Sequence, residues 1–478
     1  MALWESRWEQ PLNENFKIFS YSLPFDRRLW KVDLLGTVAH LLNLKKSGII
    51  TEEEGKRLKE AILKLYGSLL EDEGKIGGSE DIHTFMEENL TELIGDLGKK
   101  IHTGRSRNDQ VALDMRLYLR EQSCEVARLL IMLLKELLNL SRVNIDLVMP
   151  GYTHLQHAQV VTLGHYFLAY FEMFYRDLER LEAVFKEIDV MPLGCGALAG
   201  SNIPLDREYT ANLLSFSKIA ENSLDAVSDR DFVLGFLFFI ALTYLHLSRL
   251  AEEIILWSSK EFSFVELPEA FSTGSSLLPH KRNPDLCEHT RGKTGRLLGD
   301  LFWLMTTIKA LPLSYNGDLQ EDKESFFDAL DQIKIALKVW TEFLPNLRFN
   351  KERMFQLANN PFLFSTDVAE YLVMKGVPFR EAHKIVGSIV KYCEKNNKDF
   401  RDLSLEEWRQ FSLYFEEDVK RIFSPEFSIY SKKTIGSPNP EINKKIIQRK
   451  EDYLKEKEKI WKDIENKLPR LEVLLEYL

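Results

Sequence analysis

A polar loop near the middle of the chain carries side chains that can remove a proton and hold an anion. The segment 271–293 reads FSTGSSLLPHKRNPDLCEHTRGK and combines several hydroxyl groups with two adjacent cations and an asparagine. Gly274 and Pro279 prevent a regular helix through Ser275 and Ser276, so both hydroxyls are expected in a loop. A proline shortly afterwards suits the first position of a helix. A polar loop that ends at a helix N-terminus can gather backbone N–H groups around an anion.

A second polar cluster, PGYTHLQHAQ at 150–159, contains two histidines. A lone histidine is more often structural than catalytic, but His154 follows a Pro-Gly break and stands beside Thr153 and Gln156. This non-helical, polar setting suits a side chain that titrates near pH 7. His157 lies three residues further on, but no third ligand at metal spacing follows and no HExxH motif is present. Metal binding is therefore the weaker interpretation.

Two further clusters interrupt the helical pattern of the chain. TGRSRNDQ at 103–110 places two arginines and Asn108 at the start of a long helical run, where the helix dipole disfavours cations. That placement suggests an anionic ligand, although an ordinary helix cap explains the composition about as well. YNGDLQEDKE at 315–324, taken alone, is typical of a surface loop.

Neither glycine-containing segment of the chain is a nucleotide motif. Between Gly274 and Lys281 the second glycine and the Lys-Ser/Thr pair of a phosphate loop are missing, and GCGALAG at 194–200 lacks the preceding strand of a dinucleotide site. The four polar clusters together supply a base, an acid and donors for carboxylates, without a metal or cofactor motif. Proton abstraction next to a carboxylate, followed by loss of a leaving group, needs these groups.

The composition excludes several classes of protein. The 478 residues include 63 Lys and Arg against 73 Asp and Glu, and the net charge of −10 argues against partners such as nucleic acid or an anionic membrane. The four cysteines form no CxxC pair, as expected in a reducing compartment. Residues 1–10 lack the apolar core of a signal peptide, and the longest apolar run, 232–247, falls short of the roughly 20 residues of a membrane span. We therefore expect a cytoplasmic protein.

Long helices must position the four clusters. Helix-forming residues predict helices over about 108–149, 160–188, 228–260 and 284–310. The first would be roughly 60 Å long at about 1.5 Å per residue. The third is apolar on every face over 232–247, and a helix of this kind is buried all round. Because a single bundle rarely hides a helix so completely, we infer that bundles pack together in an oligomer.

The length of the chain requires more than one domain. We predict an all-α fold of three domains. These are a mainly helical N-terminal domain at 1–105, a central bundle of very long helices at 106–355 that carries the 271–293 loop and forms the core of a homotetramer, and a small helical domain at 356–478. The charged stretch 441–478 has many i, i+4 pairs and is typical of a solvated helix face.

Several motifs resemble those of a known enzyme superfamily. GSSLLPHKRNPD is similar to the GSSxMPxKxNP motif of the fumarase/aspartase superfamily, whose members release fumarate by β-elimination. GRSRND, THLQHAQ, NSLDAVSDRDF, YNGDLQEDKE and KGVPFREAH narrow the resemblance to the argininosuccinate lyase and δ-crystallin family, from about Leu3 to Pro440. The resemblance implies reversible cleavage of argininosuccinate to arginine and fumarate, the last step of arginine biosynthesis. It also implies no metal or cofactor, and a homotetramer whose active sites each combine three subunits.

The resemblance also assigns roles to individual residues. It implies that Ser275 removes the Cβ proton, that His154 protonates the departing nitrogen directly or through water, and that Glu288 orients this histidine. Lys281 and Asn283 would bind and polarise the carboxylate next to the acidic proton. Which of Ser275 and His154 is formally the base stays open. The substrate-binding positions implied by the family are Ser22, Asp81, Arg107, Asn108, Thr153, Asn283, Tyr315, Gln320 and Lys323.

The sequence departs from the family motifs at few positions, and two other functions stay open. Leu278 replaces the motif methionine, His280 stands where the family often has Gln, and Cys195 where it often has Ser. A rival within enzymes is another fumarate-releasing lyase, acting on malate, aspartate or adenylosuccinate. The rival outside enzymes is a structural protein like δ-crystallin or a helical scaffold, although either would have no need to retain Ser275 and His154. We also expect the loop to be mobile without ligand.

Overall fold

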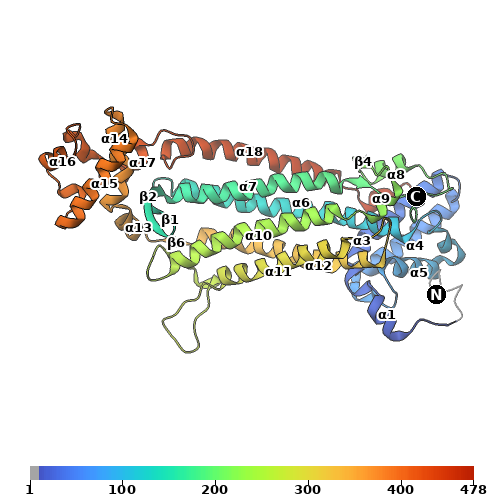
Figure 1. The fold of residues 1–478 in the computed structure, drawn as a ribbon. Coiled ribbons are helices and arrows are strands. Elements are labelled where there is room, and N and C mark those ends of the chain that lie inside the picture. Colours follow the sequence, from blue (N-terminus) through green and yellow to red (C-terminus); the bar gives the residue numbers. More distant parts are fainter. Residues whose placement is uncertain (1–9) are drawn as a thin grey trace.

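Five long helices run side by side through the middle of the molecule (Figure 1). The computed structural model describes residues 10–478, so most of the segment inspected for a signal peptide lies outside the described residues. The chain is nearly all helix, as predicted. The long helices are α6 (Arg107–Val143), α7 (Leu163–Ile188), α10 (Asp231–Ser258), α11 (Asp285–Ile308) and α12 (Asp322–Phe343).

Shorter helices gather at the two ends of this bundle (Figure 1). One end holds α1 (Glu14–Ser20), α2 (Leu23–Asp26), α3 (Trp30–Lys46), α4 (Glu52–Glu71), α5 (Ile82–Ile94), α8 (Arg207–Leu213) and α9 (Ser223–Ser228). The other end holds α13 (Lys351–Ala358), α14 (Ser365–Met374), α15 (Phe379–Asn396), α16 (Leu405–Phe411) and α17 (Pro425–Ser431). The last helices, α18 (Pro440–Lys467) and α19 (Leu471–Leu475), bring the C-terminus back to the end that holds α1.

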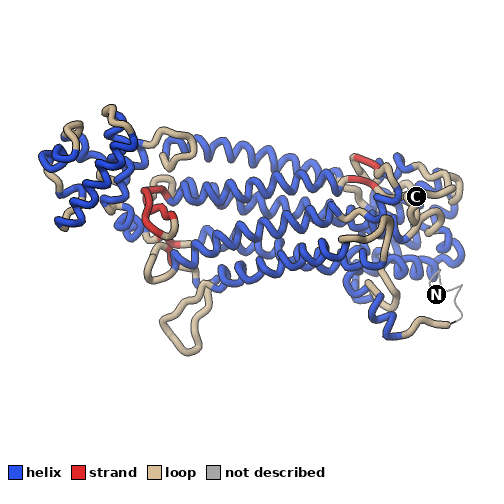
Figure 2. The backbone as a smooth tube through the Cα atoms, in the orientation of Figure 1, coloured by secondary structure: helices blue, strands red, loops and turns tan. Residues whose placement is uncertain are grey.

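Within residues 10–478, the strands are short and form three separate pairs (Figure 2). An antiparallel hairpin joins α6 to α7, and the register of its strands shifts between Pro150 and Tyr152. His154 and Leu155 form its turn, both with φ of 55°. The pairs are β1 (Val148–Thr153) with β2 (Gln156–Thr162), β3 (Val190–Met191) with β4 (Lys218–Ile219), and β5 (Val265–Glu266) with β6 (Arg348–Phe349).

The predicted helix over 108–149 is too long at its C-terminal end. The helix stops at Val143, where Asn144 donates its side-chain amide to the carbonyl of Leu140 at 2.9 Å and takes the C-cap position. The following residues form strand β1 rather than more helix, because β-branched side chains favour strands and here they pair with β2. The predicted start of the third helix is also wrong, since Ser228 ends the short helix α9 and Arg230 is the N-cap of α10.

The apolar helix α10 is only partly covered within one chain. It is the one helix among the described residues that is long and apolar enough to cross a membrane, and 61% of its most apolar window is buried inside the molecule. Phe238 and Leu245 nevertheless remain 49% and 38% exposed. On the neighbouring α11, Phe302 is 61% exposed and Trp303 is 39% exposed. The long helices therefore keep an apolar face that the chain itself does not cover.

The charged C-terminal stretch is solvated on one face only. In α18 the buried side chains Ile447, Leu454 and Trp461 recur every seven residues, so they form one stripe along the helix. This stripe packs on α6 and α7, and Lys450 and Lys457, which lie along one side of it, pair with Glu172 and Glu182 of α7. The division into three domains stays a prediction, and this helix of the predicted third domain lies along the central bundle.

Replacing Gly164 by alanine should destabilise the bundle where α6 meets α7. The Gly164 N–H donates to the carbonyl of Asn144 at 2.8 Å, and an added Cβ would lie 2.7 Å from the Ile145 Cα and 2.8 Å from the Asn144 oxygen. Backbone atoms cannot move aside as a flexible side chain can, so we expect a loss of about 1–3 kcal/mol in the free energy of unfolding. The urea midpoint measures this loss.

Gly67→Ala is the matched control for this substitution. Gly67 lies inside helix α4, and nothing stands within 4 Å of an added Cβ. Alanine costs less than glycine in a helix interior, so this variant should gain about 0.5–1 kcal/mol. A Gly164→Ala protein as stable as the parent would contradict the close packing of α6 on α7.

Candidate active site

The candidate residues lie at opposite ends of the long bundle. Helix α6 has 37 residues, which corresponds to about 55 Å, and it begins in one group of candidates and ends near the other (Figure 1). One group lies where the N-terminal helices meet the starts of α6 and α12: Ser22, Asp81, Arg107, Asn108, Tyr315, Gln320 and Lys323. The other lies on the β1–β2 hairpin, the 271–283 loop and the start of α11: Thr153, His154, Ser275, Lys281, Asn283 and Glu288.

Ser22 of the first group is buried together with Asp26. The Ser22 hydroxyl donates to Oδ2 of Asp26 at 2.6 Å, and the N–H of Ile82 donates to its Oδ1 at 3.1 Å. Burial raises the pKa of Asp26, while the charges of His83 and Lys323 and the bond from Ser22 act in the opposite direction. Asp26 does not belong to the family motifs. It nevertheless links Ser22 to α5 through its hydrogen bonds, and it lies close enough to Lys323 for the two charges to interact.

Arg107 is held by acidic and hydroxyl groups at the start of α5. Its guanidinium donates to Oγ1 of Thr84 at 3.1 Å and to Oε2 of Glu87 at 3.3 Å, and its Nε lies 3.7 Å from Oδ2 of Asp81. Burial opposes ionisation of Asp81, but the charges of His83 and Arg107, together with a bond from the Thr84 N–H, lower its pKa. Arg107 and Asp81 thus orient each other within the first group.

Tyr315 and Lys323 complete the first group from the start of α12. Burial raises the pKa of Tyr315 to about 12, and the carboxylates of Asp322, Asp81 and Asp26 contribute to the same shift. The Lys323 ammonium donates to Oδ1 of Asp322 at 2.9 Å and is almost fully buried. A phenol hydroxyl and an ammonium group therefore stand beside Asp26 and Asp81, as groups that bind a polar substrate would.

The two arginines of GRSRND have internal partners, which weakens the inference of an anionic ligand drawn from them. Arg105 is buried, donates to Oγ1 of Thr37 at 3.0 Å and lies in the field of Asp33, Asp114 and Asp109. Arg107 has its own acidic partners on α5. The cations at this helix start are therefore balanced by acids of the same chain.

Asp109 fixes the glycine-rich turn beside Asn108. Its carboxylate accepts N–H groups of Ser106, Gly194 and Gly196 at 2.8–2.9 Å, and the Asn108 amide donates to the carbonyl of Ala197 at 3.0 Å. Burial raises the pKa of Asp109 to about 6, although the backbone donors act against this shift. The GCGALAG turn, which the sequence does not mark as a nucleotide-binding motif, thus packs against Asn108, a candidate substrate-binding residue.

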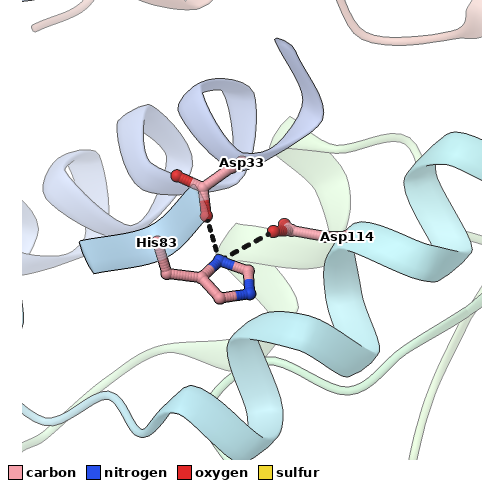
Figure 3. A group of neighbouring side chains, drawn as sticks. All are labelled: Asp33, His83 and Asp114. Atoms are coloured by element: carbon pink, nitrogen blue, oxygen red, sulfur yellow. Dashed lines mark hydrogen bonds and ion pairs between the residues drawn. The ribbon is translucent and has the colours of Figure 1, made fainter. Parts of the chain in front are cut away.

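Asp33, His83 and Asp114 form a buried acid–histidine group (Figure 3), and the charge of His83 acts on Asp26 and Asp81 next to it. Nδ1 of His83 lies 2.5 Å from Oδ2 of Asp33 and 3.3 Å from Oδ2 of Asp114, and Gln110 donates to the same Asp33 oxygen at 2.7 Å. The hydrogen bond and charge of His83 hold the pKa of Asp33 well below its usual range despite burial, while burial and the neighbouring Asp33 raise the pKa of Asp114.

Within residues 10–478, Asp33, His83 and Asp114 are the group whose ligand atoms lie close enough together to hold a metal ion. The contacts of these three residues fit a hydrogen-bonded network better than they fit a metal site. The separation of 2.5 Å between Nδ1 and Oδ2 is that of a short, charge-assisted hydrogen bond, and the Arg105 cation already acts on both carboxylates. This network joins α3, α5 and α6, the helices that carry or precede the first group.

The second group is exposed at the other end of the bundle. His154 stands at the tip of the hairpin with Thr153 beside it, and both are exposed in the single chain. Glu288 lies exposed in the first turn of α11. The 271–283 loop projects from the bundle away from the hairpin (Figure 1). A single chain therefore does not bring His154 and Ser275 together.

The loop itself is bonded at its neck and around Ser275. Oγ of Ser275 accepts the N–H groups of Leu277 at 3.2 Å and Leu278 at 3.0 Å. At the neck, the Asn283 N–H donates to the carbonyl of Thr273 at 2.8 Å. Arg282 holds the neck to the preceding segment through the carbonyl of Leu267 at 2.9 Å. Lys281 is exposed beyond this neck.

Comparisons with protein families agree over most of the chain. A family model described as lyase matches residues 6–299, and one described as argininosuccinate lyase C-terminal matches residues 362–430. The argininosuccinate lyase of Moorella thermoacetica is 50% identical over 457 residues, which cover 95% of this chain and 98% of that protein. That of Acetivibrio thermocellus is 48% identical over 92% of this chain and 96% of that protein.

Solved structures share the fold. EDDS lyase in complex with formate aligns with a TM-score of 0.84 and 27% identity, covering 95% of this chain and 92% of that chain. A class II fumarase from Schistosoma mansoni aligns with a TM-score of 0.70 over 86% of this chain, but at 17% identity it supports the fold alone.

The stability of the first group should depend on pH through buried His40. Its Nε2 donates to the carbonyl of Thr103 at 2.9 Å, and burial together with the Arg105 charge lowers the pKa of His40 to about 3. The unfolded chain takes up this proton near pH 6.5, so stability is lost as the pH falls below 6.5. Between pH 7.5 and pH 5.0, His40→Gln should lose up to about 2 kcal/mol less than the parent, measured by urea unfolding.

His383→Gln serves as the control, because His383 is exposed on α15. Its pH dependence should match that of the parent. If the His40→Gln protein loses as much stability on acidification as the parent does, buried His40 is not the source of the effect.

Proposed function

The chain belongs to the argininosuccinate lyase family, and from this membership we propose how its own residues cleave argininosuccinate to arginine and fumarate. The cleavage is a reversible β-elimination and the last step of arginine biosynthesis. A proton leaves the carbon next to one succinyl carboxylate, its electron pair forms the double bond of fumarate, and the C–N bond to the guanidino group breaks. The departing nitrogen takes up a proton. The observation that carries the proposal is the set of two residue groups described above, placed on a chain about half identical to named lyases of this kind.

Ser275 is the proposed base in this reaction. A serine hydroxyl is a weak base unless its alkoxide is stabilised. The two backbone N–H groups that point at its Oγ support this role, since they would bind the oxyanion more strongly than the neutral hydroxyl. Lys281 and Asn283, on the same loop, would bind the carboxylate next to the acidic proton. Neutralising that carboxylate lowers the cost of the second negative charge that develops as the proton leaves.

His154 is the proposed acid, with Glu288 as the carboxylate that orients it. In a single chain the His154 side chain is exposed to solvent, and no neighbouring group among the described residues fixes the direction of its ring. This exposure supports a site in which another copy of the chain supplies the groups that orient the imidazole. In the reverse reaction, which joins arginine to fumarate, the two residues exchange roles, so that His154 acts as the base and Ser275 as the acid.

The first group is the proposed binding site for the rest of the substrate. Ser22, Asn108, Tyr315, Gln320, Lys323 and Arg107 provide hydrogen-bond donors, and Thr153 adds a hydroxyl from the hairpin. Asp81 is the proposed partner of the positively charged amino-acid end. Support comes from the contacts of this group, in which each cation already has an acidic neighbour that fixes its direction.

We infer that the protein assembles into a homotetramer with active sites shared between subunits. An elongated chain with half of the site at each end can complete a site only if the opposite end of another copy lies beside it. The exposed apolar residues of α10 and α11 support such packing of bundles. A tetramer provides the three chains that the loop, the hairpin and the first group would come from. We place this acidic protein in the cytoplasm, with a small-molecule substrate.

Fumarate release separates the candidate substrates. The purified chain should produce fumarate, followed by its ultraviolet absorbance, from argininosuccinate and not from malate, aspartate or adenylosuccinate. Ser275→Ala should lower kcat by at least ~10³, because removing a group that acts in the transition state costs several powers of ten. The adjacent Ser276→Ala is the matched control and should lose less than tenfold. Release from adenylosuccinate alone would overturn the substrate, and a loss below tenfold in Ser275→Ala would overturn the base.

Mixing two variants of low activity tests whether sites are shared. Ser275→Ala and Lys323→Met carry their defects at opposite ends of the chain, so mixed oligomers would contain some sites with both groups intact. Co-refolded mixtures should regain at least tenfold the activity of either variant alone. Mixtures of Arg107→Met with Lys323→Met should regain none, because both residues belong to the same group of one chain. Equal outcomes for the two mixtures would show that the sites are not assembled in this way.

A further inference from the structure

Two motifs far apart in the sequence meet in a buried ion pair. Arg230 belongs to SDRDF at the start of α10, and Asp322 belongs to QEDKE at the start of α12. Nε of Arg230 donates to Oδ2 of Asp322, and neither side chain is exposed. A charge removed from water in this way is costly unless a partner compensates it. The proposed reaction gives neither residue a role, so the reason for this pair lies in what it contacts.

The second oxygen of Asp322 holds Lys323. The Lys323 ammonium donates to Oδ1 at 2.9 Å, and its side chain is 3% exposed. The two oxygens of one carboxylate are therefore divided between two cations, one on each side. Because Arg230 occupies Oδ2, the carboxylate cannot rotate without breaking a buried ion pair. The direction of the bond to Lys323 is thereby fixed.

Arg230 is itself anchored to the bundle through the residue before it. Nη1 of Arg230 donates to the carbonyl of Asp229 at 2.8 Å. The Asp229 carboxylate pairs with Arg116 of α6, and Arg116 also donates to the carbonyl of Glu187 at 2.6 Å. A chain of contacts thus leads from Arg116, in the third turn of α6, through the start of α10 to Lys323. Each link joins a charged group to a backbone or side-chain partner that cannot move freely.

We propose that Arg230 and Asp322 are positioning residues that hold the Lys323 ammonium toward the substrate. The proposal rests on the function above, in which Lys323 binds argininosuccinate. A lysine ammonium is a point charge on a flexible four-carbon stem, so it loses much freedom when it must face one group. Asp322 removes that freedom before the substrate arrives. One of the three ammonium protons goes to Asp322, which leaves two for a carboxylate of the substrate.

The charge balance of the three residues favours an anionic ligand. Arg230, Asp322 and Lys323 carry one net positive charge among themselves in a buried place, and Asp26 is a further acid that interacts with the charge of Lys323. Nη2 of Arg230 is buried and has no hydrogen-bond partner within residues 10–478. A substrate carboxylate on Lys323 would neutralise the excess charge. Replacing the ion pair by apolar residues of similar size keeps a core packed, so the positioning role can be separated from folding.

A double-mutant cycle tests the proposal. Arg230→Met with Asp322→Leu should lower kcat/KM for argininosuccinate at least tenfold, mainly by raising KM. When Lys323→Met is already present, the same double change should cost less than twofold, because its effect acts only through Lys323. Fumarate release gives both values. A loss of the same factor in both backgrounds would show that the pair is merely structural and overturn the proposal.

Control variants separate positioning from general damage. Arg120 and Asp189 form another largely buried pair, and Arg120 contacts the carbonyls of Leu214 and Ser215. Replacing that pair by Met and Leu should leave kcat/KM within twofold in both backgrounds. Arg230→Lys, which keeps the charge but not the planar contact, serves if the double variant does not fold, and its loss should likewise vanish with Lys323→Met. Should Lys323→Met itself leave kcat/KM unchanged, the proposal fails, while fumarate release by the parent protein stands independently.

Discussion

The rigidity of the long helices sets the constraint on which the rest of the molecule depends. A helix of 37 residues keeps its two ends about 55 Å apart, and the bundle around α6 prevents it from bending back. The residues that can take up a proton stand at one end, and those that can bind a polar substrate stand at the other. No rearrangement of loops spans such a distance. The same constraint bears on the exposed apolar side chains of α10 and α11, such as Phe238 and Phe302, which lie between the middle of the bundle and the end that holds the first group.

At the end of the bundle that holds the first group, each buried or partly buried cation has one or more acidic partners. The Arg230 guanidinium and the Lys323 ammonium share Asp322, Arg107 has Asp81 and Glu87, and behind them His83 shares a proton network with Asp33 and Asp114. Each acid lowers the cost of burying a cation, and each hydrogen bond fixes the direction of the cation it holds. This part of the molecule thereby holds several buried or partly buried cations in fixed directions although the chain as a whole is acidic.

The sequence predicted the parts of the fold that depend on local chemistry. The long helices over about 160–188 and 284–310 follow from helix-forming residues, and α7 and α11 occupy nearly the same ranges. Gly274 and Pro279 placed Ser275 in a loop. The end of α6 at Val143 was missed because no glycine or proline marks it, and the side-chain cap by Asn144 depends on the chain turning into the hairpin. The buried stripe of α18 was missed because lysine and glutamate dominate its composition.

Long-range pairing explains why part of the candidate site escaped sequence reasoning. Asp26 lies outside the family motifs, and Arg230 and Asp322 lie within two of them without an assigned role, since an acid or an arginine at a helix start is usually interpreted as a cap or a surface charge. Arg230 and Asp322 are 92 positions apart, and only the packing of α10 against α12 brings them into contact. Motif resemblance identifies residues that touch a substrate because those are the ones the motif is known for. Residues that act through such a neighbour must be found from burial: removing an ion pair from water costs free energy, so a buried pair that also holds a third charged group is a candidate for such a role.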